Sequence, residues 1–128
     1  MSSCRPDIFD ARCPSRAVFE TLAEKWSMLI LHRLVEGPRR PSELRRSIGG
    51  ISDKMLVQTL RSLERNGFVA RRNFAEVPPR VEYALTDLGR SLAAVVRDLD
   101  QWVETHFFDI ADAQGAYDRA RAAGRPAD

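Results

Sequence analysis

The chain has 128 residues, of which 44% are hydrophobic and 30% charged, and its formal net charge is +2. This length and balance predict a single domain, 1–128. Within it we expect a core of about 13–110 and flexible ends at 1–12 and 119–128. The N-terminus is too polar for a signal peptide and no apolar run approaches the roughly 18 residues needed to span a bilayer, so we expect a cytoplasmic protein with no membrane partner.

Two helices are predicted in the first third of the chain. In Ser15–Leu22, Val18 lies four residues before the final leucine, so the two apolar side chains share one face. In Trp26–Glu36 an apolar face continues until Gly37-Pro38 ends the helix. Its apolar residues are Trp26, Leu29, Ile30 and Leu34. We expect these helices to form the core.

A short helix, a glycine turn and a long helix are predicted next. Pro41–Ile48 is the short helix, Gly49-Gly50 is the turn, and Ser52–Asn66 is the long helix. Ser52 is expected to cap the long helix and Gly67 to end it. This order of elements predicts a helix-turn-helix.

The long helix is amphipathic. Leu56, Leu60 and Leu63 recur with helical spacing and predict one buried face. An outward polar stripe is formed by Lys54, Gln58, Arg61 and Arg65. Cations and amides in a row can bond to base edges and neutralise phosphates. A basic stripe alone is equally typical of a solvated face, so the neighbouring elements decide between the two interpretations.

A β-hairpin is predicted directly after this helix, within Phe68–Leu85. The run Arg80–Leu85 alternates charged and apolar residues, and Pro78-Pro79 cannot continue a sheet. Three arginines lie on or beside the hairpin: Arg71, Arg72 and Arg80. A hairpin after a helix-turn-helix is a wing, whose cations would lie along the DNA backbone or enter the minor groove.

Basic charge is concentrated in the segment 39–72, which carries nine Lys or Arg and three Asp or Glu. Its net charge is +6, whereas the whole chain is only +2, which leaves −4 for the remainder. Such an asymmetry indicates a polyanionic partner, here double-stranded operator DNA. The residues expected to contact it are Ser52, Lys54, Gln58, Arg61, Arg65, Arg45, Arg46, Arg71, Arg72 and Arg80.

Thr86 is expected to cap a C-terminal helix. From Leu88 an apolar stripe continues for four turns, and Phe107, Phe108 and Ile110 extend it. A helix-turn-helix usually dimerises to read two half-sites about 34 Å apart, so we expect a homodimer formed through this helix and the first one. The expected interface residues are Val18, Leu92, Val95, Leu99, Trp102 and Val103. The elements together predict a mainly α chain with a small β-hairpin (α+β), a winged helix-turn-helix with N- and C-terminal dimerisation helices.

Two motifs in this chain, Val77–Tyr83 and Ile51–Leu56, are typical of one known family. Further matching residues are Cys13-Pro14, Lys25-Trp26, Leu29-Ile30-Leu31, Glu43-Leu44, Leu60, Leu63-Glu64, Gly67, Leu85-Thr86, Leu88-Gly89 and Trp102. With these residues the chain resembles the HxlR family of bacterial winged helix-turn-helix regulators, relatives of the MarR group. The resemblance implies a homodimeric, sequence-specific DNA-binding transcriptional regulator. Two departures are Pro41, where an aromatic residue is common, and Ala23-Glu24, where Gly-Gly is usual.

The resemblance also implies that Cys13, before the first helix, senses oxidants or electrophiles, as in several members of the family. A helix N-terminus lowers a thiol pKa from its ordinary value of about 8.5, and Arg12 and Arg16 lie close enough in sequence to stabilise a thiolate further. The alternative is a small buried residue at the dimer interface. Cys4 either resolves an oxidised Cys13 or has no redox role.

The sequence contains no motif typical of an enzyme, a metal site or a cofactor site. Catalysis would need a nucleophile with its base, a metal set or a cofactor loop, and two cysteines and two histidines without zinc-ligand spacing offer none. We therefore expect no enzymatic activity, no metal and no cofactor. Two alternatives stay open. One is a winged helix that binds protein, which acidic residues within the basic stripe would favour, whereas Asp53 and Glu64 lie off that stripe. The other is a regulator that responds to a non-covalently bound small ligand.

Overall fold

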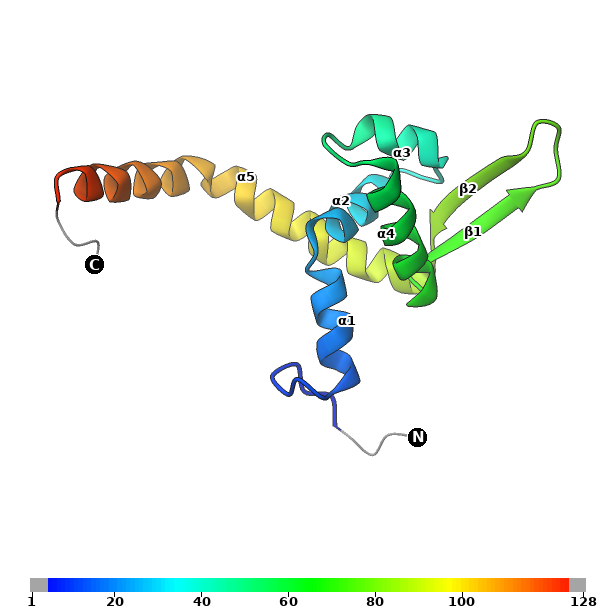
Figure 1. The fold of residues 1–128 in the computed structure, drawn as a ribbon, viewed down its shortest axis with the longest axis horizontal. Coiled ribbons are helices and arrows are strands. Elements are labelled where there is room, and N and C mark those ends of the chain that lie inside the picture. Colours follow the sequence, from blue (N-terminus) through cyan, green and yellow to red (C-terminus); the bar gives the residue numbers. More distant parts are fainter. Residues whose placement is uncertain (1–4, 125–128) are drawn as a thin grey trace. The chain divides into compact units, whose positions relative to one another are not determined.

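The computed structural model describes residues 5–124, and the chain divides into two compact units, one ending at Val96 and the other beginning at Arg97. The first unit contains α1 (Pro14–Leu22), α2 (Lys25–Leu34), α3 (Pro41–Ser47), α4 (Asp53–Arg65), β1 (Val69–Phe74) and β2 (Arg80–Leu85), as Figure 1 shows. Helix α5 (Asp87–Ala122) begins in the first unit and continues as the second. These elements confirm the predicted fold class, a mainly α winged helix-turn-helix.

The core of the first unit lies around α2. Its buried residues Ile30, Leu31 and Leu34 belong to one cluster with buried leucines of α3 and α4. The bases of both strands and Ala93 of α5 complete this cluster. Each buried methylene contributes about 0.8 kcal/mol, so this apolar cluster supplies the main force that holds the helix-turn-helix and the hairpin together.

The helix-turn-helix is delimited by local hydrogen bonds. Ser52 caps α4 because its Oγ accepts from the Met55 amide at 3.1 Å. The chain leaves α4 at Gly67, whose φ of +82° is a left-handed conformation that glycine adopts without strain. The Phe68 amide then donates to the Leu63 carbonyl at 2.9 Å, which closes the end of the helix. Both predicted limits of the long helix are confirmed.

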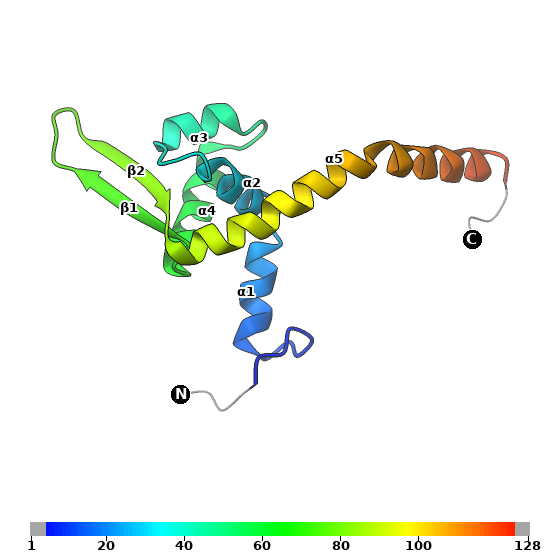
Figure 2. The same cartoon turned by 180° about the vertical axis from the view of Figure 1, so that it is seen from behind.

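The hairpin is antiparallel, with a register that runs from Val69 opposite Leu85 to Phe74 opposite Arg80. Only its base is buried, and Figures 1 and 2 show the rest extending past α3 and α4. Arg39 forms a single bridge with Tyr83, through backbone bonds of 2.9 and 2.8 Å. Pro41 follows this bridge as the first residue of α3, where its missing amide costs nothing.

The start of α5 packs directly on the turn after α4. The Thr86 hydroxyl donates to the Gly67 carbonyl at 2.6 Å and accepts from the Gly89 amide at 3.0 Å, which confirms Thr86 as the cap. A Cβ added at Gly89 would lie 1.9 Å from the Phe68 carbonyl oxygen, so glycine alone fits there. Helix α5 runs on through Ala122. Its last turns are rich in alanine and arginine, which are strong helix formers.

Candidate nucleic-acid interface

Helix α4 separates its apolar and polar residues onto different faces. Leu56, Leu60 and Leu63 are at most 2% exposed and pack in the core. The four residues of the polar stripe are all exposed: Lys54, Gln58, Arg61 and Arg65. Within residues 5–124, the three cations of this stripe form no ion pair. Their charge and hydrogen-bond donors are therefore directed to solvent on one continuous surface.

The other candidates on the helix-turn-helix are partly engaged. The Ser52 hydroxyl is used as the cap of α4. Arg45 of α3 pairs with Asp53 at the start of α4, with 3.1 Å between Nε and Oδ1. Both side chains are more than half exposed, and exposed pairs of this kind contribute only about 0–1 kcal/mol, so a phosphate can compete for Arg45. Arg46 is exposed beside it.

The three arginines of the hairpin have different environments. The Arg80 guanidinium lies 4.1 Å from the centroid of the Phe74 ring and also pairs with Glu76 at 3.3 Å and Glu82 at 3.9 Å. Arg71 and Arg72 are exposed and form no ion pair in the described part of the chain. Because neighbouring residues of a strand point to opposite faces, the hairpin presents one unpaired arginine on each face. Arg80 instead stiffens the hairpin from within.

Two arginines that sequence reasoning missed position the elements of this interface. Arg33, in the last turn of α2, donates from Nη2 to the Ser47 carbonyl at the end of α3, at 3.1 Å. Arg39 carries the bridge to Tyr83 at the base of the hairpin. Glu36 lies between them, 4.0 Å from Arg33 Nη1 and 3.0 Å from Arg39 Nη2. The bond from Arg33 to Ser47 and the bridge from Arg39 to Tyr83 join separate elements, so no periodic pattern signals them.

The predicted dimer residues of the first unit are largely solvent-facing. Val18 on α1 and Val95 on α5 are exposed. Leu92 is half-buried because it packs against the core of its own chain. Phe19, which the sequence analysis did not select, is also exposed on α1. Helix α1 has no buried residue, so its apolar side chains lack a complete covering in one chain.

The second unit is a single helical segment with a row of exposed large apolar residues. Leu99, Trp102 and Val103 belong to it, as predicted, and Trp102 is 53% exposed. Phe107 and Phe108 are exposed as well. The Trp102 ring stacks on His106 at a centroid distance of 4.5 Å, and His106 Nδ1 lies 2.8 Å from the Trp102 carbonyl oxygen. Such a row is an apolar surface of the kind that protein partners cover.

Cys13 is buried, with 5% of its surface exposed, at the cap position of α1. The segment 5–12 contacts its thiol through the Asp7 amide, which donates to Sγ at 3.4 Å. Ser15 Oγ, on α1, lies 3.2 Å from Sγ. The two arginines nearby in sequence each have a carboxylate partner, since Arg12 pairs with Asp10 and Arg16 pairs with Glu20. Sequence reasoning missed the covering segment, which has no periodic pattern. Cys4 lies outside the described residues.

Residues 5–124 contain neither a membrane-spanning helix nor a cluster of metal ligands. No helix there is long and apolar enough to cross a membrane. In the same residues, His, Cys, Asp and Glu side chains form no group of three or more that could hold a metal ion.

Known proteins are similar to this chain in sequence and in fold. The model of the HxlR-like helix-turn-helix family matches residues 21–110. YtfH of Escherichia coli strain K12, named as an uncharacterized HTH-type transcriptional regulator, is 44% identical over 104 residues, which are 81% of this chain and 82% of YtfH.

Solved structures of transcriptional regulators also match this chain. The structure of ytfH from Salmonella typhimurium, named as a transcriptional regulator, matches with a TM-score of 0.82 and 40% identity, over 87% of this chain and 99% of that one. The redox regulator HypR in its oxidized form matches with a TM-score of 0.67 and 35% identity, over 73% of this chain and 96% of that one.

Proposed function

Because this chain belongs to the HxlR-like helix-turn-helix family of transcriptional regulators, we propose that it binds operator DNA as a homodimer, with α4 in the major groove and the hairpin as the wing. The observation that carries this proposal is the exposed stripe of α4. Lys54, Gln58, Arg61 and Arg65 face solvent along about three turns, on the side opposite the buried leucines. Arginine, lysine and glutamine are the side chains that form bidentate bonds with guanine and adenine edges.

The wing and the end of α3 supply sequence-independent affinity. Arg71, Arg72 and Arg46 are exposed and lack carboxylate partners within the described residues. Each phosphate that such a cation neutralises releases counterions and adds about 0.9 to the slope of log affinity against log salt. Arg80 contributes differently, because its guanidinium holds the hairpin in shape.

The exposed apolar side chains of α1 and α5 support a homodimer. Val18, Val95, Leu99, Trp102 and Val103 are all exposed in one chain. A two-fold axis would bury each patch against its equivalent and would present two copies of α4 to half-sites about 34 Å apart. The same axis predicts a palindromic operator.

In vitro selection from random DNA tests recognition and identifies the operator at the same time. The full chain is incubated with random duplex DNA, and bound fragments are amplified and sequenced. We expect one palindromic motif whose half-sites lie about one helical turn apart. Failure to enrich any motif at moderate salt, with the protein folded and dimeric, would contradict the proposal.

We further propose that Cys13 switches DNA binding in response to oxidants or electrophiles. The similarity to HypR, which is named a redox regulator, supports this role. The packing around the thiol supplies a mechanism: Sγ is covered by the segment 5–12, which is tied to α1 by the Asp7 amide and by Arg16 Nη1 bonded to the Ile8 carbonyl at 3.4 Å. Because Cys13 is only 5% exposed, an adduct on Sγ would displace this segment from the start of α1.

A covalent adduct can supply the free energy that a switch needs. Changing the DNA-competent fraction from 99% to 1% requires about 5.5 kcal/mol of difference between the two states. With diamide, two thiols lose two electrons and two protons to the azo bond and become one disulfide. The second thiol is Cys4 or added glutathione. Because α1 carries Val18 and Phe19 of the proposed dimer surface, its displacement would change the spacing of the two copies of α4.

A further inference from the structure

The tip of the hairpin is an exposed apolar segment, Val77-Pro78-Pro79. All three residues are exposed, and Val77 is the most exposed large apolar residue of the described chain. Runs of roughly three or four exposed apolar residues are avoided in proteins unless they serve a contact. The two prolines have no amide hydrogen and the three side chains have no charge, so they cannot bind phosphates as cations or donors. The tip therefore suits an apolar surface of a partner.

The tip is held in place by Arg80, the first residue of β2. Its guanidinium lies 4.1 Å from the centroid of the Phe74 ring and pairs with Glu76 at 3.3 Å, so it joins both sides of the turn. The Glu76 amide donates to the Phe74 carbonyl at 2.8 Å, which tightens the turn further. Pairing with Arg80 also offsets the repulsion that the Glu76 carboxylate would feel from DNA phosphates. Arg80 Nε is buried, so this arginine presents Val77 rather than offering that donor to DNA.

The length of the hairpin matches the distance between neighbouring grooves of a duplex. Strand β1 runs over six residues from the buried Val69, which gives about five steps of roughly 3.3 Å, or about 17 Å. In B-form DNA a major groove and the next minor groove are separated by about half of the roughly 34 Å helical turn, which is also about 17 Å. With α4 in the major groove, the tip of the hairpin is long enough to reach the neighbouring minor groove.

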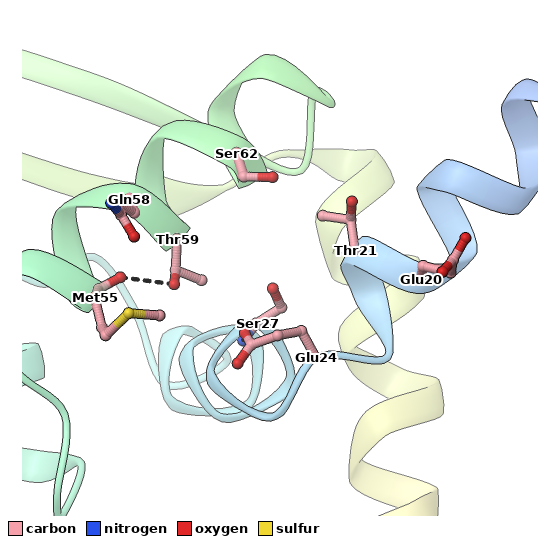
Figure 3. Close-up of a pocket in the computed structure, with 8 residues that line it drawn as sticks. All are labelled: Glu20, Thr21, Glu24, Ser27, Met55, Gln58, Thr59 and Ser62. Carbon is pink, nitrogen blue, oxygen red and sulfur yellow. Dashed lines mark hydrogen bonds between the residues drawn. The ribbon is translucent and has the colours of Figure 1, made fainter.

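The charges around α4 favour an approach of DNA on the hairpin side. On the side that faces α1 and α2, α4 borders an open groove whose lining includes Glu20 and Glu24, as Figure 3 shows. Within the described residues, no lysine or arginine lines that groove. The hairpin instead carries the exposed Arg71 and Arg72 between its base and its tip. Attraction of phosphates to these cations would bring the tip against the duplex.

We propose that Val77 contacts the floor of the minor groove and favours A·T base pairs there. This inference rests on the proposed DNA binding and adds a specificity-determining residue to it. At an A·T pair the minor groove presents only acceptors, whereas a G·C pair adds the 2-amino group of guanine, which would hold the valine methyl groups away from the floor. Tracts of A·T pairs also have a narrow minor groove, so both walls can contact the tip. Apolar side chains, proline included, are used in this groove by other DNA-binding proteins.

Base analogues that change only the minor groove test this proposal on the selected operator. Replacing adenine with 2,6-diaminopurine adds the 2-amino group, and replacing guanine with inosine removes it, while the major-groove pattern stays the same. The analogues are scanned across the operator. About five base pairs from each half-site core, half a helical turn away, we expect diaminopurine to weaken wild-type binding by about tenfold. A G·C pair at the same position should have the same effect, and an inosine·cytosine pair should restore the affinity.

Two protein variants separate the minor-groove contact from the major-groove contact. Because Val77 is fully exposed, Val77→Ala removes no packing within the chain. It should weaken operator binding by about tenfold, the effect of losing two buried methyl groups, and should abolish most of the discrimination against diaminopurine. Arg61→Ala is the matched control on α4. It should bind the operator more weakly and still discriminate against diaminopurine.

Three results would overturn the proposal. Equal affinity of the wild type for adenine and diaminopurine at every position would show that the minor groove is not read. Discrimination that persists in Val77→Ala would assign the minor-groove contact to another residue. Unaltered operator affinity of Val77→Ala would show that the tip makes no contact worth measuring. None of these results contradicts the proposed DNA binding, which fails only if the wild type selects no operator.

Discussion

Replacing Arg61 with alanine should remove operator recognition while the fold stays intact. Arg61 lies in the middle of the α4 stripe, exposed and without an ion pair in the described residues. Such a surface change alters the free energy of unfolding by only about 0.5 kcal/mol, and alanine is a good helix former. A bidentate base contact is worth about 1–3 kcal/mol of discrimination, which corresponds to a loss of about 5- to 150-fold in operator affinity.

Fluorescence anisotropy with labelled operator and with scrambled DNA, across a range of salt concentrations, measures this effect. Arg61→Ala should bind the operator more weakly and scrambled DNA almost normally. Arg72→Ala, on the exposed part of β1, should weaken binding to both and reduce the salt slope by about one unit, because one phosphate is no longer neutralised. Arg119→Ala, an exposed arginine near the end of α5, is the matched control and should behave like the wild type.

Two outcomes would contradict base reading by Arg61. Equal losses on both DNAs for Arg61→Ala and Arg72→Ala would mean that α4 is only a phosphate clamp. Unchanged operator affinity of Arg61→Ala would remove base reading by this residue altogether. A parallel thermal unfolding curve shows whether any loss comes from a changed fold.

Three further substitutions test assembly, sensing and packing. Trp102→Asp should convert the dimer into a monomer at micromolar concentration, because it places a charge in an apolar interface; a wild-type protein that sediments as a monomer yet binds the palindrome tightly would contradict this. Diamide should release the wild type from its operator, with recovery after dithiothreitol, whereas Cys13→Ser should stay bound and Cys4→Ser should be released fully or in part. Normal release of Cys13→Ser would leave Cys13 as a packing residue. Gly89→Ala should lower the free energy of unfolding by about 1–3 kcal/mol or more, because the added Cβ meets the Phe68 carbonyl. Gly115→Ala should raise the free energy of unfolding by up to about 1 kcal/mol, because its Cβ meets only the flexible Arg119 side chain and alanine is the better helix former. Equal melting temperatures of the two glycine variants at matched protein concentration would refute the packing argument.

The parts of the fold that depend on local bonds could be predicted from the sequence. Ser52, Gly67 and Thr86 act within a few residues of their own position, so their residue types indicated the limits of α4 and the start of α5. The hairpin followed from the alternation in Arg80–Leu85 and from the prolines at its tip. The exposed stripe of α4 followed from its helical period.

Contacts between distant segments could not be predicted in this way. The clustering of Arg80 with Phe74 depends on the register of the two strands, which the sequence pattern alone does not specify. The bond from Arg33 to the end of α3 depends on how α2 and α3 pack. The cover over Cys13 is an irregular segment held by backbone bonds such as that of Asp7, and its residues carry no period from which to infer it.

Dimethyl sulfate interference on the selected operator tests most directly whether α4 reads the major groove as part of a dimer. The reagent methylates guanine N7, which lies in the major groove. We expect methylation to block binding at guanines in two symmetric clusters about one helical turn apart, and Arg61→Ala to lose interference at the same position in each cluster. Absence of any interference at guanines within the protected sequence, or one unpaired cluster, would contradict a dimeric reader that uses α4.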